Sequence, residues 1–126
     1  MFPPLFAVLN ASTAVKALLG TNPLRVYLFG EGPAVGAATY AKPYAVWQTI
    51  TGSPENYLAG VPDTDGFTTQ IDVYADTPST ARNAAKAIRD AIEPVAYIAG
   101  WRGESREADT NLFRLSFDVD WLTPRT

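Results

Sequence analysis

The chain has 126 residues, of which 47% are hydrophobic and 18% charged, and this composition is typical of a folded globular domain with a core of its own. It contains no cysteine and no histidine, which excludes disulfides and thiolate metal sites and removes the commonest general base. The formal net charge of −3 opposes binding to nucleic acid through its phosphates.

The N-terminal segment is predicted to be helical. Apolar residues recur from Leu5 to Leu19, and Gly20 ends the segment. Ser12 or Thr13 is a candidate cap for its second half.

Nothing in the sequence predicts export or membrane insertion. The start of the chain has no positively charged region, and Pro3 and Pro4 interrupt its apolar run, unlike the pattern of a signal peptide. No stretch approaches the roughly 20 apolar residues of a membrane span. We therefore expect a soluble protein with no membrane partner, which stays in the cytoplasm where it is made.

Two strands and two long connections follow. Residues 25–29 and 44–51 are predicted strands. Residues 30–43 are rich in Gly, Ala and Pro and have no periodicity, and residues 52–66 carry turn chemistry together with three acidic side chains. Connections of this length usually have a functional explanation.

Residues 67–93 form the strongest pair of predicted elements. Residues 67–75 alternate between apolar and polar side chains, as a strand with one buried face does. Asp76 or Thr77 can cap the following helix, which Pro78 can begin and Pro94 ends. The apolar stripe of this helix consists of Ala81, Ala84, Ala85, Ile88, Ala91 and Ile92.

Two more strands are predicted at 95–101 and 111–122, joined by a charged turn at 102–110. The order is α-β-β-β-α-β-β, so we expect a single α+β domain over residues 1–126, with a mostly antiparallel or mixed sheet and helices packed on one face. Trp47, Trp101 and Trp121 fall on strands and are expected in the core or at an interface.

The polar sides of the third and last strands would make one acidic face if these strands are neighbours. That face would carry Asp72, Asp118 and Asp120 and would lie against water or a water-filled space. The three carboxylates could bind Mg²⁺ or Ca²⁺. A solvated sheet face is the simpler interpretation, so we predict no metal site, no cofactor and no catalytic residue.

Several stretches together resemble one known family. They are the N-terminal helix, RVYLFG at 25–30, PYAVWQTITGSPENYL at 43–58, FxxQIDVYAD at 67–76, the alanine-rich helix, and RLSFDVDW at 114–121. In this order they are similar to the tail-terminator or tail-completion proteins of long-tailed bacteriophages and prophages, of the lambda type.

The resemblance implies a non-enzymatic virion protein that assembles in the host cytoplasm. It implies a homohexameric ring that caps the tail tube, ends its polymerisation and joins the tail to the head-completion or stopper protein, while DNA passes through without specific binding. Asp72, Asp118 and Asp120 are then expected to face the channel. Docking candidates are Glu31, Val35, Tyr40, Glu55, Tyr57, Asp63 and Asp65, and subunit-interface candidates are Arg82, Arg89, Trp101 and Arg102.

Three alternatives remain at this point. The chain could be another ring protein of the neck or head–tail connector. It could be a small cytoplasmic ligand-binding protein or a metal-assisted enzyme that uses the three aspartates. Within a ring, the same aspartates could instead pair with Arg82 or Arg89 of the next subunit.

Overall fold

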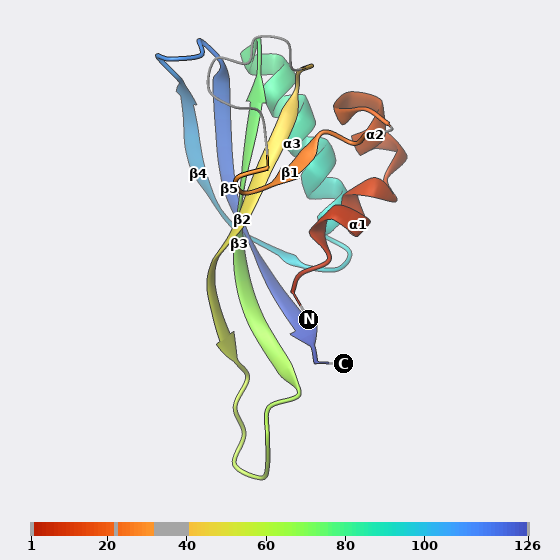
Figure 1. The fold of residues 1–126 in the computed structure, drawn as a ribbon, viewed down its shortest axis with the longest axis vertical. Coiled ribbons are helices and arrows are strands. Elements are labelled where there is room, and N and C mark those ends of the chain that lie inside the picture. The colour runs from red at the N-terminus through yellow and green to blue at the C-terminus, as the bar shows by residue number, and fades with distance from the viewer. Residues whose placement is uncertain (1, 22, 32–40, 126) are drawn as a thin grey trace.

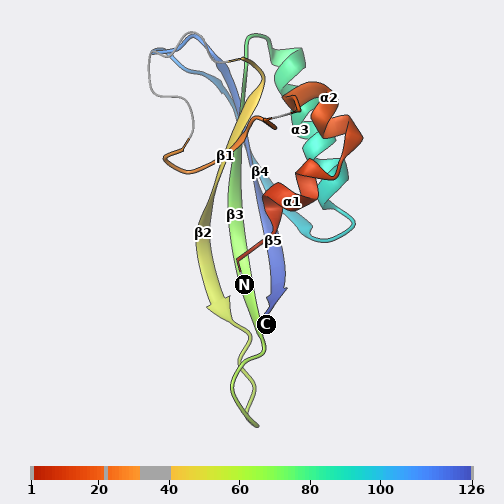
Figure 2. The ribbon, with the colours of Figure 1, turned by 45° about the vertical axis from the view of Figure 1, so that its right-hand side comes forward.

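The computed structural model describes residues 2–21, 23–31 and 41–125, and these residues form three helices and a five-stranded sheet (Figure 1). The helices cover one face of the sheet, as Figures 1 and 2 both show, which confirms the predicted α+β class. The element order is also confirmed, except that the first predicted helix is divided into two short ones.

The two N-terminal helices are α1 (Leu5–Asn10) and α2 (Thr13–Leu19). The chain divides there because the Ser12 hydroxyl accepts a hydrogen bond from the Val15 N–H at 3.2 Å and so starts a new helix. Gly20 follows α2 with a φ of 89°, a backbone conformation that favours glycine. The fully buried residues of the two helices are Leu5, Leu9, Val15 and Leu19.

Helix α3 (Pro78–Ile92) is the main helix of the fold. Of the two candidate caps, Thr77 is the one used, since its hydroxyl accepts a hydrogen bond from the Thr80 N–H at 3.2 Å. The predicted stripe faces the sheet: Ala81, Ala84, Ala85, Ile88 and Ile92 are buried, and Ala91 is half-buried. Four small residues in the stripe let α3 lie close against its neighbours.

The sheet has the strand order β1-β2-β3-β5-β4. Among the described strands β1 and β2 run parallel and the other neighbours are antiparallel, so the sheet is mixed as predicted. The bounds are β1 (Val26–Leu28), β2 (Tyr44–Pro54), β3 (Thr64–Ala75), β4 (Tyr97–Arg106) and β5 (Phe113–Pro124). β2 and β3 extend beyond their predicted ends because they pair with each other as far as Pro54 and Asp65.

The predicted charged turn at 102–110 is wrong in its first half. Arg102 and Glu104 lie within β4, and the reversal of the chain comes after Arg106. β4 is an edge strand, and its register shifts next to Gly100 and Gly103, so its side chains lose the simple alternation by which a strand is recognised.

The core fills the space between the helices and the sheet. The predicted buried side of β3 is confirmed, and on β5 Leu115, Phe117, Val119 and Trp121 are buried. The Trp121 indole N–H donates to the buried Thr69 hydroxyl at 3.0 Å, which satisfies both polar groups. Trp47 packs on the edge of this core, whereas Trp101 is 52% exposed.

Candidate functional site

The sheet face opposite the helices carries a network of polar side chains centred on Asp72. β3 and β5 are neighbours, as the acidic-face prediction required, and Asp72 lies opposite Ser116. The Asp72 carboxylate accepts hydrogen bonds from the Arg114 guanidinium at 3.2 Å, from the Gln70 amide at 3.1 Å and from the Ser116 hydroxyl. Only 14% of the Asp72 side chain is exposed, so this carboxylate is engaged within its own subunit.

The other two aspartates of this face also have partners in the same chain. Asp118 accepts from the Arg102 guanidinium at 2.8 and 2.9 Å, and the exposed Asp120 accepts from the Thr68 hydroxyl at 2.6 Å. Among the described residues, no three acidic side chains gather closely enough to hold a metal ion. The three aspartates therefore do not form the carboxylate cluster that a metal-assisted enzyme would need.

One end of this face is aromatic. The rings of Tyr44 and Tyr74 stack with their centroids 5.1 Å apart. Burial, followed by the negative charges of Asp72 and Glu107, raises the pKa of Tyr74 to about 12. Burial also raises the pKa of the Tyr44 hydroxyl. Both hydroxyls therefore hold their protons more tightly than an unperturbed tyrosine does.

The connection between β2 and β3 forms a projecting arm, which we define as residues 55–63. Figures 1 and 2 show it extending beyond the rest of the molecule. The Glu55 N–H donates to the Thr64 carbonyl at 2.9 Å, and Tyr57 and Gly60 pair near the tip. Its apolar side chains are nevertheless exposed: Tyr57 by 50%, Val61 by 76% and Leu58 completely. The arm is therefore an ordered hairpin that holds apolar groups out in solvent.

The root of the arm is fixed by an ion pair. The Arg125 guanidinium donates to both oxygens of Asp65, at 2.9 and 2.8 Å, and the Asp65 side chain is only 8% exposed. These hydrogen bonds from Arg125 lower the pKa of Asp65. Asp65 was a predicted docking residue, but its burial makes it a support of the arm instead. Glu55 and Asp63 remain exposed on the arm.

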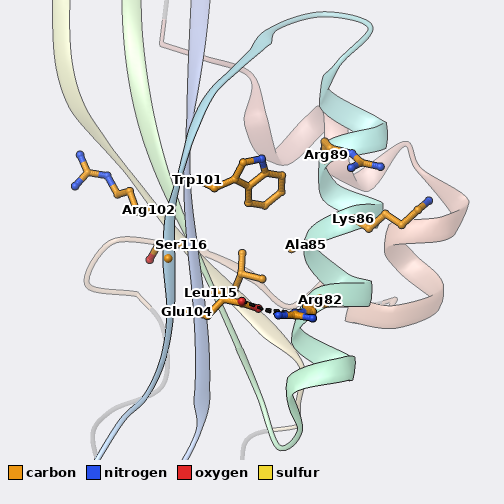
Figure 3. Close-up of a pocket in the computed structure, with 10 residues that line it drawn as sticks. Arg82, Ala85, Lys86, Arg89, Trp101, Arg102, Glu104, Leu115 and Ser116 are labelled. Carbon is orange, nitrogen blue, oxygen red and sulfur yellow. Dashed lines mark hydrogen bonds and ion pairs between the residues drawn. The ribbon is translucent and has the colours of Figure 1, made fainter.

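A groove of about 440 Å³ lies between α3 and the edge strand β4 (Figure 3). Its apolar lining comes from Ala85, Trp101 and Leu115. The Trp101 ring packs on the buried Phe117 ring, with centroids 4.8 Å apart, so this half-exposed indole is held in place. The groove, as we use the term, is lined by Arg82, Ala85, Lys86, Arg89, Trp101, Arg102, Gly103, Glu104, Leu115 and Ser116.

Cations dominate the charged side chains around the groove. Arg82, Lys86 and Arg89 extend from α3, and Arg82 bonds to Glu104 of β4 at 2.6 and 2.8 Å, as Figure 3 shows. Lys86 and Arg89 pair along the helix with Asp90, which lies outside the groove. All of these pairs are exposed, and exposed pairs of this kind exchange partners at little cost.

The structure therefore places the predicted interface residues in two groups. Arg82, Arg89 and Trp101 meet at the groove, while the Arg102 side chain turns away from α3 to the polar face (Figure 3). Of the docking candidates in the connection 30–43, Glu31 is exposed, and its N–H donates to the Leu28 carbonyl at 2.9 Å. Val35 and Tyr40 lie outside the described residues.

Several residues of these surfaces were missed by sequence reasoning. Leu58 and Val61 gave a usable signal, because apolar residues in a turn-rich connection have no core to fill. Lys86, Glu104 and Leu115 gave none, since only the packing of α3 beside β4 brings them together.

No helix within the described ranges is long and apolar enough to cross a membrane.

Comparison with known proteins identifies the family. No curated protein matches the chain. A solved structure titled "Virion of native gene transfer agent (GTA) particle" has a similar fold, with a TM-score of 0.63 and 18% sequence identity over 95% of this chain and 91% of the other. The model of the family "Tail completion protein gp17" matches residues 3–124, which is nearly the whole sequence. The chain belongs to this family of tail completion proteins.

Proposed function

We propose that this chain is a structural virion subunit that forms a homohexameric ring on the end of the tail tube. The ring ends polymerisation of the tube and joins the tail to the head-completion protein. Subunits meet in the host cytoplasm and remain in the neck region of the virion. The observation that carries this proposal is the family match over residues 3–124.

Two features of the structure support a subunit role over an enzymatic one. The arm and the groove are exposed and partly apolar, as contact surfaces are, and they lie on different parts of the chain. Asp72 accepts hydrogen bonds from Arg114 and Ser116 of the same face, so its carboxylate is not free to act as a general acid or base.

The polar sheet face is the surface that we assign to the channel. Asp72 and Asp118 are matched by Arg114 and Arg102, so the face combines fixed charges of both signs with a net negative charge. A face of this kind offers DNA phosphates no unpaired cationic patch and lets the duplex move along it. Thus DNA passes through the ring without specific binding.

The test of the ring is its mass in solution, measured by light scattering after size exclusion. A single chain weighs 13.6 kDa, so six copies in closed symmetry weigh about 82 kDa. The protein is measured alone and after addition of assembled tail tubes, so that a ring that forms only on the tube is also detected. A protein that binds no second copy of itself under either condition would contradict the proposal.

A second experiment distinguishes a tail terminator from another neck ring. Particles that lack the protein should carry tails of abnormal length that do not join heads. The purified protein should retain tail-tube protein in a pull-down. Normal tail length without it, together with binding to the portal side alone, would favour the connector alternative.

A further inference from the structure

The arm has the properties of an incomplete contact surface. Its root carries the ion pair of Asp65 with Arg125, yet it presents Tyr57, Leu58 and Val61 to solvent. A short two-stranded hairpin gains little from its own contacts in water, so an ordered arm of this kind is stabilised when a partner covers it. The partner must accept a bulky apolar tip.

The groove offers the complementary surface on the same chain. It is a depression of about 440 Å³ with an apolar lining from Ala85, Trp101 and Leu115, which is large enough to take apolar side chains of the arm tip. It cannot be filled by the arm of its own subunit, because Figure 1 places the arm at one end of the sheet and α3 along the other half.

The charges of the two surfaces are also complementary. The arm carries Glu55 and Asp63, and no lysine or arginine occurs between residues 43 and 81, so the arm and both of its strands lack cations. Of the charged side chains that line the groove, Arg102 points to the polar face and pairs with Asp118, and three of the other four are cations from one helix: Arg82, Lys86 and Arg89. Opposite charges at the rim of an interface set its orientation and favour the correct partner.

We propose that the arm of one subunit docks in the groove of the neighbouring subunit. This inference rests on the proposed ring and names the contact that builds it. Arm and groove are different patches, so the contact is head-to-tail, and a repeated head-to-tail contact gives a closed ring when the rotation closes. Each subunit then gives one arm and receives one, and the half-exposed Trp101 becomes covered.

Cysteine cross-linking tests the contact directly, because the natural chain contains no cysteine. Leu58→Cys is made in a tagged chain and Lys86→Cys in an untagged chain, and the two are mixed and oxidised, alone and with tail tubes. We expect a disulfide-linked pair of one tagged and one untagged chain, seen on a non-reducing gel. Ala17→Cys, an exposed position on α2, replaces Lys86→Cys as the matched control and should give no such product.

The outcomes separate this inference from the proposed function. A ring of the expected mass without the crossed disulfide would overturn the arm contact and leave the ring in place. A cross-link from Leu58→Cys to a different protein of the particle would also overturn it, since the arm would then serve another partner. No self-association with or without tubes would overturn both proposals.

Charge reversal gives a second test that does not depend on oxidation. One variant combines Glu55→Lys with Asp63→Lys, and the other combines Arg82→Glu with Lys86→Glu. Each alone presents like charges at every contact and should fail to form rings, whereas an equal mixture restores opposite charges in an alternating ring of even subunit number. Recovery of the ring only in the mixture supports the contact and shows that both variants are folded. Rings from either variant alone would contradict it.

Discussion

Helix α3 and the arm use apolar residues in opposite ways. In α3, Ala84, Ile88 and Ile92 are almost completely withdrawn from water, and the charged side chains occupy the outer surface. In the arm, Leu58 and Val61 are exposed although they lie within a few residues of a well-paired sheet. The core of this fold is therefore complete without the arm, and the apolar residues of the arm are available for contact with another molecule.

The largest expected loss of stability comes from the core beneath the groove. Phe117→Ala removes a fully buried ring that supports Trp101, and we expect a loss of about 3–5 kcal/mol in the free energy of unfolding, because the cavity cannot close fully. Urea unfolding followed by circular dichroism measures it. Phe29→Ala, at an exposed position, should change the same quantity by less than about 0.5 kcal/mol. Equal losses of unfolding free energy in the two variants would contradict the assignment of Phe117 to the core and Phe29 to the surface.

Ionisation of Tyr74 on the polar face should destabilise the folded protein at high pH. The pKa of Tyr74 is about 12 in the folded protein, against 10.0 for an unperturbed tyrosine, so the folded state holds this proton more tightly. The resulting stability is complete below pH 10 and is lost as the pH rises towards 12, by up to roughly 2 kcal/mol.

Comparison with Tyr74→Phe isolates this effect. The phenylalanine variant cannot ionise at this position, so its free energy of unfolding should fall less than that of the natural chain as the pH rises through this range. Urea unfolding at pH values on both sides of the transition measures the difference. Parallel loss in both proteins would mean that the Tyr74 hydroxyl is not protected by the fold.

The start of α3 should contribute a smaller amount. Thr77→Ala removes the hydroxyl that accepts from the Thr80 N–H, and losing such a cap costs about 1 kcal/mol. The midpoint of urea unfolding measures it. Thr13→Ala, an exposed threonine in the first turn of α2, is the matched control and should be nearly neutral. A neutral Thr77→Ala would show that α3 is held by packing alone.

The elements of the core could be predicted from the sequence because local and tertiary preferences agree there. The strict alternation of β3 and the apolar stripe of α3 both match the buried faces. The extent of β4 could not be predicted, since its outer residues are polar on both sides and its pairing depends on β5, which follows it in the chain. When a strand forms because it pairs with a neighbour, its own residue types indicate its length poorly.

The candidate surfaces could be predicted only in part. The acidic face follows from alternation, but the charge pattern of residues 102–110 predicts a turn, so the sequence does not predict the pairing of Arg102 with Asp118 across the sheet. The groove depends on how α3 lies beside β4, where the neighbouring side chains of Trp101 and Arg102 point to opposite faces of the strand and only Trp101 faces α3. That geometry is a property of the assembled sheet.

The smallest effect on stability and the largest on assembly are expected at the tip of the arm. Leu58→Ser should change the free energy of unfolding by less than about 0.5 kcal/mol, because this side chain is fully exposed in the single subunit. The same change should lower the fraction of protein in rings, measured by light scattering, because the tip no longer buries an apolar side chain in the groove of its neighbour. Leu122→Ser, at another exposed leucine, is the matched control and should leave the ring intact. If Leu58→Ser destabilised the isolated subunit as Phe117→Ala does, the arm would belong to the core after all.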